Sequence, residues 1–196
     1  MTPLVGQGQI RFVLSWSNGP KDLDIHSIFK ISDNETCEVY FGKRDCLGTE
    51  LNTDTTRFGS NGVQTLTINT LGKYNYTIAV NKYIHKNSFN SSDDKPIKSL
   101  YQENSTPSGR NVPVQNLPLS KSNAQISVYI DGYREAIYKL KIQNILNKND
   151  NGDKINVDSF NWWWAFCLDG NKGLNNIKAI NRLTSESPGN QNCENV

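Results

Sequence analysis

Hydrophobic and polar residues alternate strictly in several stretches of the chain, and the first of these lies near the N-terminus. Within residues 11–17 the apolar side chains of Phe12, Leu14 and Trp16 take every second position. A period of two places successive side chains on opposite faces of a β-strand, so these three predict the core side of a strand. Residues 18–20 (Asn-Gly-Pro) then predict a turn, because glycine accepts unusual backbone angles and proline donates no hydrogen bond.

The alternation resumes after this turn, and here one face of the predicted strand carries charged and polar side chains. Leu23 and Ile25 face one side of the predicted strand, whereas Asp22, Asp24 and His26 face the other. Residues two apart on a strand lie about 6.5–7 Å from each other, so three possible ligand groups share one face. This spacing suits a hard cation bridged by carboxylates.

Two later pairs of alternating segments predict further strands. Residues 63–69 and 74–83 form a hairpin-like pair, and residues 124–130 and 136–142 form a second hairpin. Each pair is joined by a short segment that contains glycine. These pairs, together with the first two strands, make most of the predicted sheet structure.

An aromatic stretch over residues 158–168 predicts one more strand. Trp162, Trp164 and Phe166 share one face of this strand, which we interpret as core, and Trp163 takes the other face. An outward Trp163 is a cross-strand partner, a platform on which a sugar ring stacks, or part of a protein interface. The pattern alone leaves these three interpretations open.

The fold class that these elements predict is all-β: an antiparallel sandwich, Ig-like or jelly-roll-like, with about eight strands. The 196 residues, 36% of them hydrophobic, are enough to bury a core, and we expect a single domain over 1–196. A polar, proline-containing excursion interrupts the pattern at 82–122. It is either a flexible insertion or an arm that docks on a neighbouring subunit. Residues 173–196 predict a polar tail along the surface.

Charge and hydropathy exclude two classes of partner. The net charge is +2, from 21 basic and 19 acidic residues scattered along the chain, so we expect no nucleic-acid binding. No apolar run approaches the roughly 20 residues of a membrane-spanning helix. The N-terminal residues lack the basic and apolar regions of a signal peptide, so we expect a secreted form to be a mature or truncated chain.

Cysteine usage favours an oxidising compartment. The chain has four cysteines, no C-x-x-C pair and two histidines, which favours disulfides over zinc. Cys37 and Cys46 flank a short loop and can close it, which leaves Cys167 to tie the tail through Cys193. Two other pairings remain open.

Four N-x-S/T sequons point to the same compartment, and they begin at Asn34, Asn75, Asn90 and Asn104. Alternation in the strand that contains Asn75 places this residue on the face expected to meet solvent. Together the sequons and cysteines predict an extracellular, secreted glycoprotein.

The first half of the chain resembles a known family. Trp16, Pro20 and the run Asp22-Leu23-Asp24-Ile25-His26 match a signature, W-x-x-x-P-x-D-L-D-L-H, of secreted or surface β-sandwich domains that are common in bacteria and largely uncharacterised. In that family an aromatic-Gly segment, a Leu-x-x-Asp loop, a Gly-rich turn and a G-x-Y-x-V-x-V strand follow. The corresponding segments here are 40–42, 51–54, 59–62 and 72–80. The resemblance covers about residues 9–83, implies a secreted sandwich, and departs at Val63 and Gln64, where members often carry an acidic residue.

Two hypotheses account for the acidic residues. In the first, Asp22, Asp24 and Asp54, with Asn52 as a further ligand, bind Ca²⁺, which takes six to eight oxygen ligands. In the second, the carboxylates cap turns and accept backbone hydrogen bonds, and so hold residues 48–62 against the hairpin that the first two strands form. His26 is a poor calcium ligand, and we expect it to be structural.

Function follows from what the chain carries and lacks. It contains no G-x-S-x-G, H-E-x-x-H or phosphate-binding glycine loop, and we expect that it is not an enzyme. We expect a secreted structural glycoprotein that forms a homo-oligomer or polymer, as a subunit of a self-assembling extracellular filament or surface coat. The alternative is a calcium-assisted module in which Trp163 and the acidic residues bind a carbohydrate or a receptor.

Overall fold

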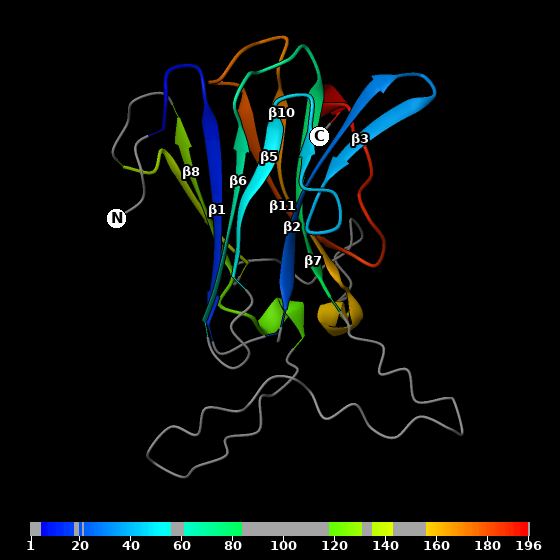
Figure 1. The fold of residues 1–196 in the computed structure, drawn as a ribbon. Coiled ribbons are helices and arrows are strands. Elements are labelled where there is room, and N and C mark those ends of the chain that lie inside the picture. The colour runs from blue at the N-terminus through cyan, green and yellow to red at the C-terminus, as the bar shows by residue number, and fades with distance from the viewer. Residues whose placement is uncertain are drawn as a thin grey trace, which may run out of the picture.

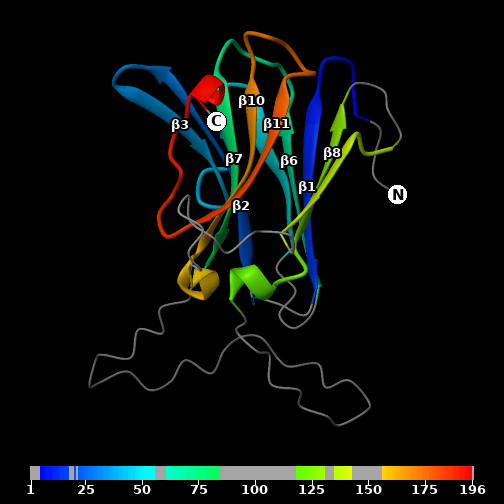
Figure 2. The same ribbon diagram turned by 180° about the vertical axis from the view of Figure 1, so that it is seen from behind.

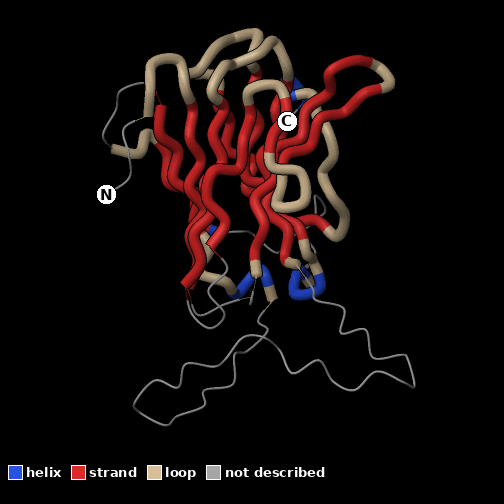
Figure 3. The backbone as a smooth tube through the Cα atoms, viewed as in Figure 1, coloured by secondary structure: helices blue, strands red, loops and turns tan. Residues whose placement is uncertain are grey.

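The computed structural model describes residues 5–17, 20, 22–55, 61–83, 118–130, 135–142 and 156–195. These residues form eleven strands in two antiparallel sheets that pack as a sandwich, which confirms the predicted fold class with more strands than the eight expected. Figure 1 and Figure 2 show the two layers from opposite sides, and Figure 3 shows that strands make up most of the described backbone. The short 3₁₀ turns are η1 (Leu119–Lys121), η3 (Val157–Ser159) and η4 (Cys193–Asn195).

The first sheet has six strands in the order β4-β5-β6-β1-β8-β9. Their bounds are β1 (Ile10–Ser17), β4 (Asp45–Cys46), β5 (Thr49–Thr55), β6 (Asn61–Ile68), β8 (Gln125–Ile130) and β9 (Tyr138–Lys141). The second sheet has five strands in the order β11-β10-β7-β2-β3. Their bounds are β2 (Leu23–Ser32), β3 (Glu35–Val39), β7 (Asn75–Lys82), β10 (Trp162–Asp169) and β11 (Ile177–Thr184). The end of the β2–β3 hairpin projects beyond the sandwich at the upper right of Figure 1.

The core lies between the sheets and follows the alternation of the strands. Phe12, Leu14 and Trp16 of β1 are buried in it, as their spacing predicted. Trp16 pairs with Gly62 across the β1–β6 ladder, and a Cβ at position 62 would lie 1.9 Å from a carbon of the indole. Glycine is therefore required at position 62 because the indole occupies the space of a side chain.

Two of the expected hairpins are instead crossings between the sheets. β1 and β2 are consecutive but lie in different sheets, and so do β6 and β7. After β6 the chain crosses to the second sheet near Gly72, whose N–H donates to the hydroxyl of buried Tyr76 at 2.9 Å. Alternation fixes which side chains face the core, but it does not fix which strands pair, and that is why these hairpin predictions were wrong. The β8–β9 hairpin is confirmed.

The prediction for Trp163 was also wrong. Trp163 is fully buried in the core, and its indole N–H donates to Asn181 at 3.0 Å. The β10 register shifts between Trp164 and Phe166 against both neighbouring strands, which is a β-bulge. The bulge reverses the alternation, so Trp163 and Phe166 both face the core while Trp162 and Trp164 face outward. Trp163 is therefore no platform for a sugar.

The predicted polar tail contains a strand. Residues 177–184 form β11, an edge strand beside β10, so only the residues after it run along the surface. This final segment crosses the outer face of the second sheet, where the backbone N–H of Gln191 donates to Thr77 of β7. A disulfide fixes its end.

Several predictions fall outside the described residues. Most of the excursion at 82–122 does, with the sequons at Asn90 and Asn104, and so do residues 18–19 and 131–134. In the part of the chain that the structure describes, no helix has the length and apolar character needed to cross a membrane.

Candidate functional site

The acidic residues predicted to form a cation site do come together at one end of the sandwich. Asp22 precedes β2, Asp24 lies on β2, and Asp54 lies on β5 beside Gln64 of β6. The ionisation of Asp22 is affected by the charges of both Asp24 and Asp54, which places the three carboxylates within mutual electrostatic range. Segments that are distant in sequence thus converge.

Gln64 holds this cluster together. Its buried amide donates from Nε2 to Oδ1 of Asp24 at 3.0 Å and to Oδ1 of Asp54 at 2.9 Å. Its Oε1 accepts the backbone N–H of Ile25 at 2.7 Å. One neutral side chain therefore joins the two sheets and bonds to both carboxylates. No local pattern in the sequence indicates this role, and Gln64 stood out only as a departure from the family signature.

The environment of the cluster disfavours ionisation of Asp22. Its burial, and after it the negative charges of Asp24 and Asp54, raise the pKa of Asp22 to about 7. Asp24 is 3% exposed, whereas Asp22 keeps part of its contact with solvent, which screens its charge in part. Near neutral pH the cluster therefore holds a carboxyl that is poised between its two forms.

The cluster fits a calcium ion poorly. An amide nitrogen cannot ligate Ca²⁺, and the Nε2 of Gln64 takes up one oxygen of Asp24 and one of Asp54. Asn52 bonds with Glu50 and Thr67 instead of joining the cluster. Among the described ranges, no group of three or more His, Cys, Asp or Glu side chains has an arrangement that could hold a metal ion. The hydrogen bonds to Asp24 and Asp54 come from the Gln64 side chain rather than from the backbone amides of the second hypothesis, and the calcium site stays a prediction.

A second candidate site consists of aromatic side chains from four segments. We call it the aromatic face, and it comprises His26, Tyr40, Phe41, Tyr83 and Trp162. These rings come from β2, the turn after β3, the residue after β7, and β10. The sequence did not indicate the aromatic face, because its segments are distant along the chain and Trp162 was assigned to the core.

Ring contacts connect the aromatic face from one end to the other. His26 meets the Trp162 ring edge-on, with centroids 4.8 Å apart, and stacks on Tyr40 at 5.3 Å. Tyr40 contacts Phe41 at 5.3 Å, and Phe41 contacts Tyr83 at 5.5 Å, both in T-shaped geometry. The indole reaches His26 across β7, where Ala79, the register partner of His26, has only a methyl group.

Exposure differs along the aromatic face. His26 is buried, Tyr40 and Trp162 are half-buried, and Phe41 and Tyr83 are 42% and 39% exposed. At the buried end of the aromatic face, His26 Nδ1 lies 2.8 Å from Oε1 of Glu38, whose side chain is 41% exposed. The hydrogen bond from His26 lowers the pKa of Glu38, so this carboxyl is ionised at neutral pH.

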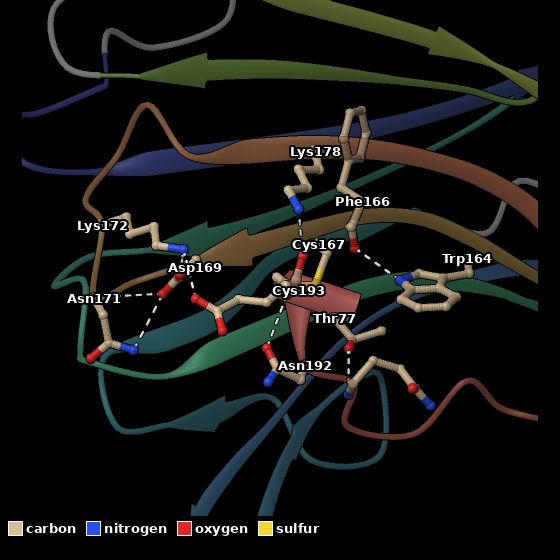
Figure 4. Close-up of a disulfide and its surroundings, with 12 residues drawn as sticks. Thr77, Trp164, Phe166, Cys167, Asp169, Asn171, Lys172, Lys178, Asn192 and Cys193 are labelled. Atoms are coloured by element: carbon tan, nitrogen blue, oxygen red, sulfur yellow. Dashed lines mark hydrogen bonds and ion pairs between the residues drawn. A yellow bond between two sulfur atoms is a disulfide. The ribbon is translucent and has the colours of Figure 1, made fainter. Parts of the chain in front are cut away.

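The disulfides are those that the cysteine spacing favoured. Cys37 of β3 pairs with Cys46 of β4 and so links the two sheets, and Cys167 of β10 pairs with Cys193. Figure 4 shows Cys193 against the outer face of β10, near Trp164. Lys178 of β11 donates to the Cys193 carbonyl at 2.7 Å. The second disulfide thus fixes the C-terminal segment over an apolar part of the sheet.

The two described sequons differ in accessibility. Asn34 lies in the exposed turn between β2 and β3. Asn75 is half-buried, and its Oδ1 is buried with no hydrogen-bond partner in the described structure. We expected the face of β7 that carries Asn75 to meet solvent. This was wrong for Thr77 and Ala79, which lie on the same face and are fully buried.

The chain was compared with known protein families, curated proteins and solved structures. No family model, curated protein or solved structure matches the chain. The resemblance of residues 9–83 to the bacterial sandwich family stays a prediction.

Proposed function

We propose that this protein is a secreted, disulfide-stabilised β-sandwich module that binds a ligand outside the cell through the aromatic face. The observation that carries the proposal is the unbroken series of ring contacts that ends at two exposed aromatic side chains, Phe41 and Tyr83. Scattered exposed hydrophobic residues are normal on a protein surface. Exposed rings that adjoin one another, rather than lying scattered, support a site of interaction at this surface.

The compartment in the proposal rests on the disulfides and on Asn34. Two disulfides in a domain of this size are typical of proteins that fold in an oxidising environment. Asn34 lies in an exposed turn, where a glycan would meet solvent. The proposal requires no calcium, because Gln64 already bonds to Asp24 and Asp54.

A self-assembling structural subunit is the second candidate, and the open edges of the sheets favour it. In the described structure, β9 and β11 each pair on one side only. Unpaired edges can add a strand from another copy. However, β9 carries Lys139 and Lys141, and β11 is interrupted near Asn181, whose φ is 52°. Edge lysines and bulges oppose pairing between edges, so the aromatic face supports the binding module better.

Sedimentation velocity of the full disulfide-bonded chain, without added ligand, tests the proposal. We expect a single species near 22.1 kDa plus any glycan, in the wild type and in Phe41→Ala alike. A polymer that Phe41→Ala disperses would make the aromatic face a subunit interface. A polymer that persists in Phe41→Ala would favour assembly through other surfaces, and either polymer contradicts the proposal.

A further inference from the structure

We infer that the ligand of the aromatic face is a carbohydrate, with sugar rings stacked on Phe41 and Tyr83 and hydroxyl groups donating to Glu38. This inference rests on the proposed function and names the chemical class of its ligand. Three properties of the site lead to it: exposed rings that contact one another, a partly exposed carboxylate bonded to His26 of the same face, and a small area.

The exposed rings are fixed in orientation before any ligand arrives. Phe41 lies between Tyr40 and Tyr83, with interplanar angles of 90° and 76°. In a T-shaped contact the edge of one ring meets the face of the other, so these contacts limit how far the rings can rotate. The apolar C–H face of a sugar ring can therefore stack without a large loss of side-chain freedom.

The carboxylate decides between ligand classes. An ionised carboxylate has about four acceptor sites, and His26 uses one of those on Glu38. A lipid chain or an apolar protein surface that covers Glu38 along with the aromatic face would take water from this carboxylate and return no hydrogen bond, which is costly. Sugar hydroxyls replace that water with donors. The mixture of ring faces and an open acceptor thus matches a ligand with alternating apolar and hydroxyl surfaces.

Charge and size disfavour the competing partners. The charge of Lys43 helps to lower the pKa of Glu38, so the cation that acts on this carboxylate is accompanied by an anion, whereas binding to anionic lipids relies on clustered cations. A stable protein interface buries about 800 Å² on each partner. The aromatic face offers only two rings that are more than a third exposed, which suits one or two sugar units better than a second protein.

The experiment measures binding of the full disulfide-bonded chain to cellulose, chitin, curdlan and mannan in pull-down assays, and to a glycan array. Phe41→Ala, Tyr83→Ala and Glu38→Gln test the site. Tyr138→Ala is the matched control, because Tyr138 is also 39% exposed but lies on β9 of the other sheet. Circular dichroism and thermal melting establish that each variant is folded.

We expect the wild type and Tyr138→Ala to bind at least one of these glycans equally. Phe41→Ala and Tyr83→Ala should each bind about tenfold more weakly, the order of magnitude of one lost stacking contact with its buried area. Glu38→Gln should also weaken binding while leaving the melting temperature unchanged. Absence of glycan binding by the wild type overturns the inference, as does equal binding by folded Phe41→Ala.

A parallel assay on extracellular material from the source organism separates failure of this inference from failure of the proposed function. The material is used untreated and after periodate oxidation, which destroys sugar rings. Binding that survives oxidation but is lost in Phe41→Ala overturns the carbohydrate inference and leaves the binding module standing. Equal retention of the wild type and Phe41→Ala on every surface overturns both.

Discussion

Replacing Asp22 by asparagine should stabilise the protein at alkaline pH and leave its stability at acid pH unchanged. Asp22 has a pKa of about 7 in the folded state, against 3.8 for an ordinary aspartate. Asparagine keeps an oxygen that can accept the hydrogen bond from the Leu23 backbone, but it never ionises. The substitution therefore removes the charge and little else.

The sign follows from proton linkage. Because the folded state raises this pKa, it binds the proton more tightly than the unfolded state does between pH 3.8 and about 7. The contribution of Asp22 to the free energy of unfolding is therefore unimpaired below pH 3.8. It falls through this window and reaches its lowest value above pH 7. The Asp22→Asn variant has no such fall, so the variant and wild type should diverge as pH rises.

The pKa shift of Asp22 sets an upper limit on the free energy of unfolding that the substitution can recover, and solvent screening lowers it. A shift of roughly three pKa units corresponds to about 4 kcal/mol. Asp22 remains partly exposed, so solvent screening reduces this to about 1–2 kcal/mol. Urea denaturation at pH 4 and pH 8 measures the difference between variant and wild type, in which the titration of groups that do not interact with Asp22 cancels.

The control is Asp33→Asn, in the exposed turn of the β2–β3 hairpin. The hydrogen bond with Lys30 lowers the pKa of Asp33, so its neutralisation should give no stabilisation at pH 8. The reasoning is refuted if Asp22→Asn destabilises the protein at pH 8, or if its effect is the same at both pH values. Either result would mean that Asp22 is not repelled by its neighbours in the folded state.

Four further predictions concern the cluster, the sequons and the tail. Gln64→Glu should lower the free energy of unfolding at pH 8 by about 2–4 kcal/mol in urea titrations, because it removes two N–H donors and adds a buried charge; an unchanged midpoint would contradict the role of Gln64. Addition of calcium at roughly millimolar concentration, which saturates even weak extracellular sites, should leave the melting temperature of the wild type unchanged in differential scanning fluorimetry. An increase in the melting temperature that is absent in Asp22→Asn would instead support the calcium-site hypothesis. Peptide mass spectrometry of secreted protein should find a glycan at Asn34 and none at Asn75, and full occupancy of Asn75 would show that its side chain is accessible. Replacing Cys167 and Cys193 together by serine should cost about 3 kcal/mol of stability, measured by denaturation under non-reducing conditions, and no change would mean that this disulfide does not constrain the tail.

The sequence predicted the sandwich because period-two alternation survives wherever a strand has one buried face. In β1 every second side chain is in the core, and the cysteine spacing favoured the pairs that the structure contains. The same alternation could not assign partners. A short connection near Gly72 serves equally well for a hairpin within one sheet and for a crossing to the other sheet, and only packing of the complete core decides between them.

The candidate sites show the same limit more sharply. The bulge between Trp164 and Phe166 reverses the phase of β10, and no local pattern marks it, so Trp163 was placed outside and Trp162 inside. Gln64 was noted as a lost acidic residue, whereas its amide bridges two carboxylates across the sheets. Long-range pairing created both features, and neither has a signature within a single strand.

Hydroxyl-radical footprinting tests the central claim most directly, because it reports which aromatic side chains a bound ligand covers. The chain is oxidised briefly, free and bound to soluble fragments of the glycan that retains it, and modified peptides are quantified by mass spectrometry. The proposed site predicts protection of Phe41 and Tyr83 in the complex, with Tyr138 oxidised equally in both states. Protection of Tyr138 with unchanged oxidation of Phe41 and Tyr83 would contradict the proposed site and place the ligand on the other sheet.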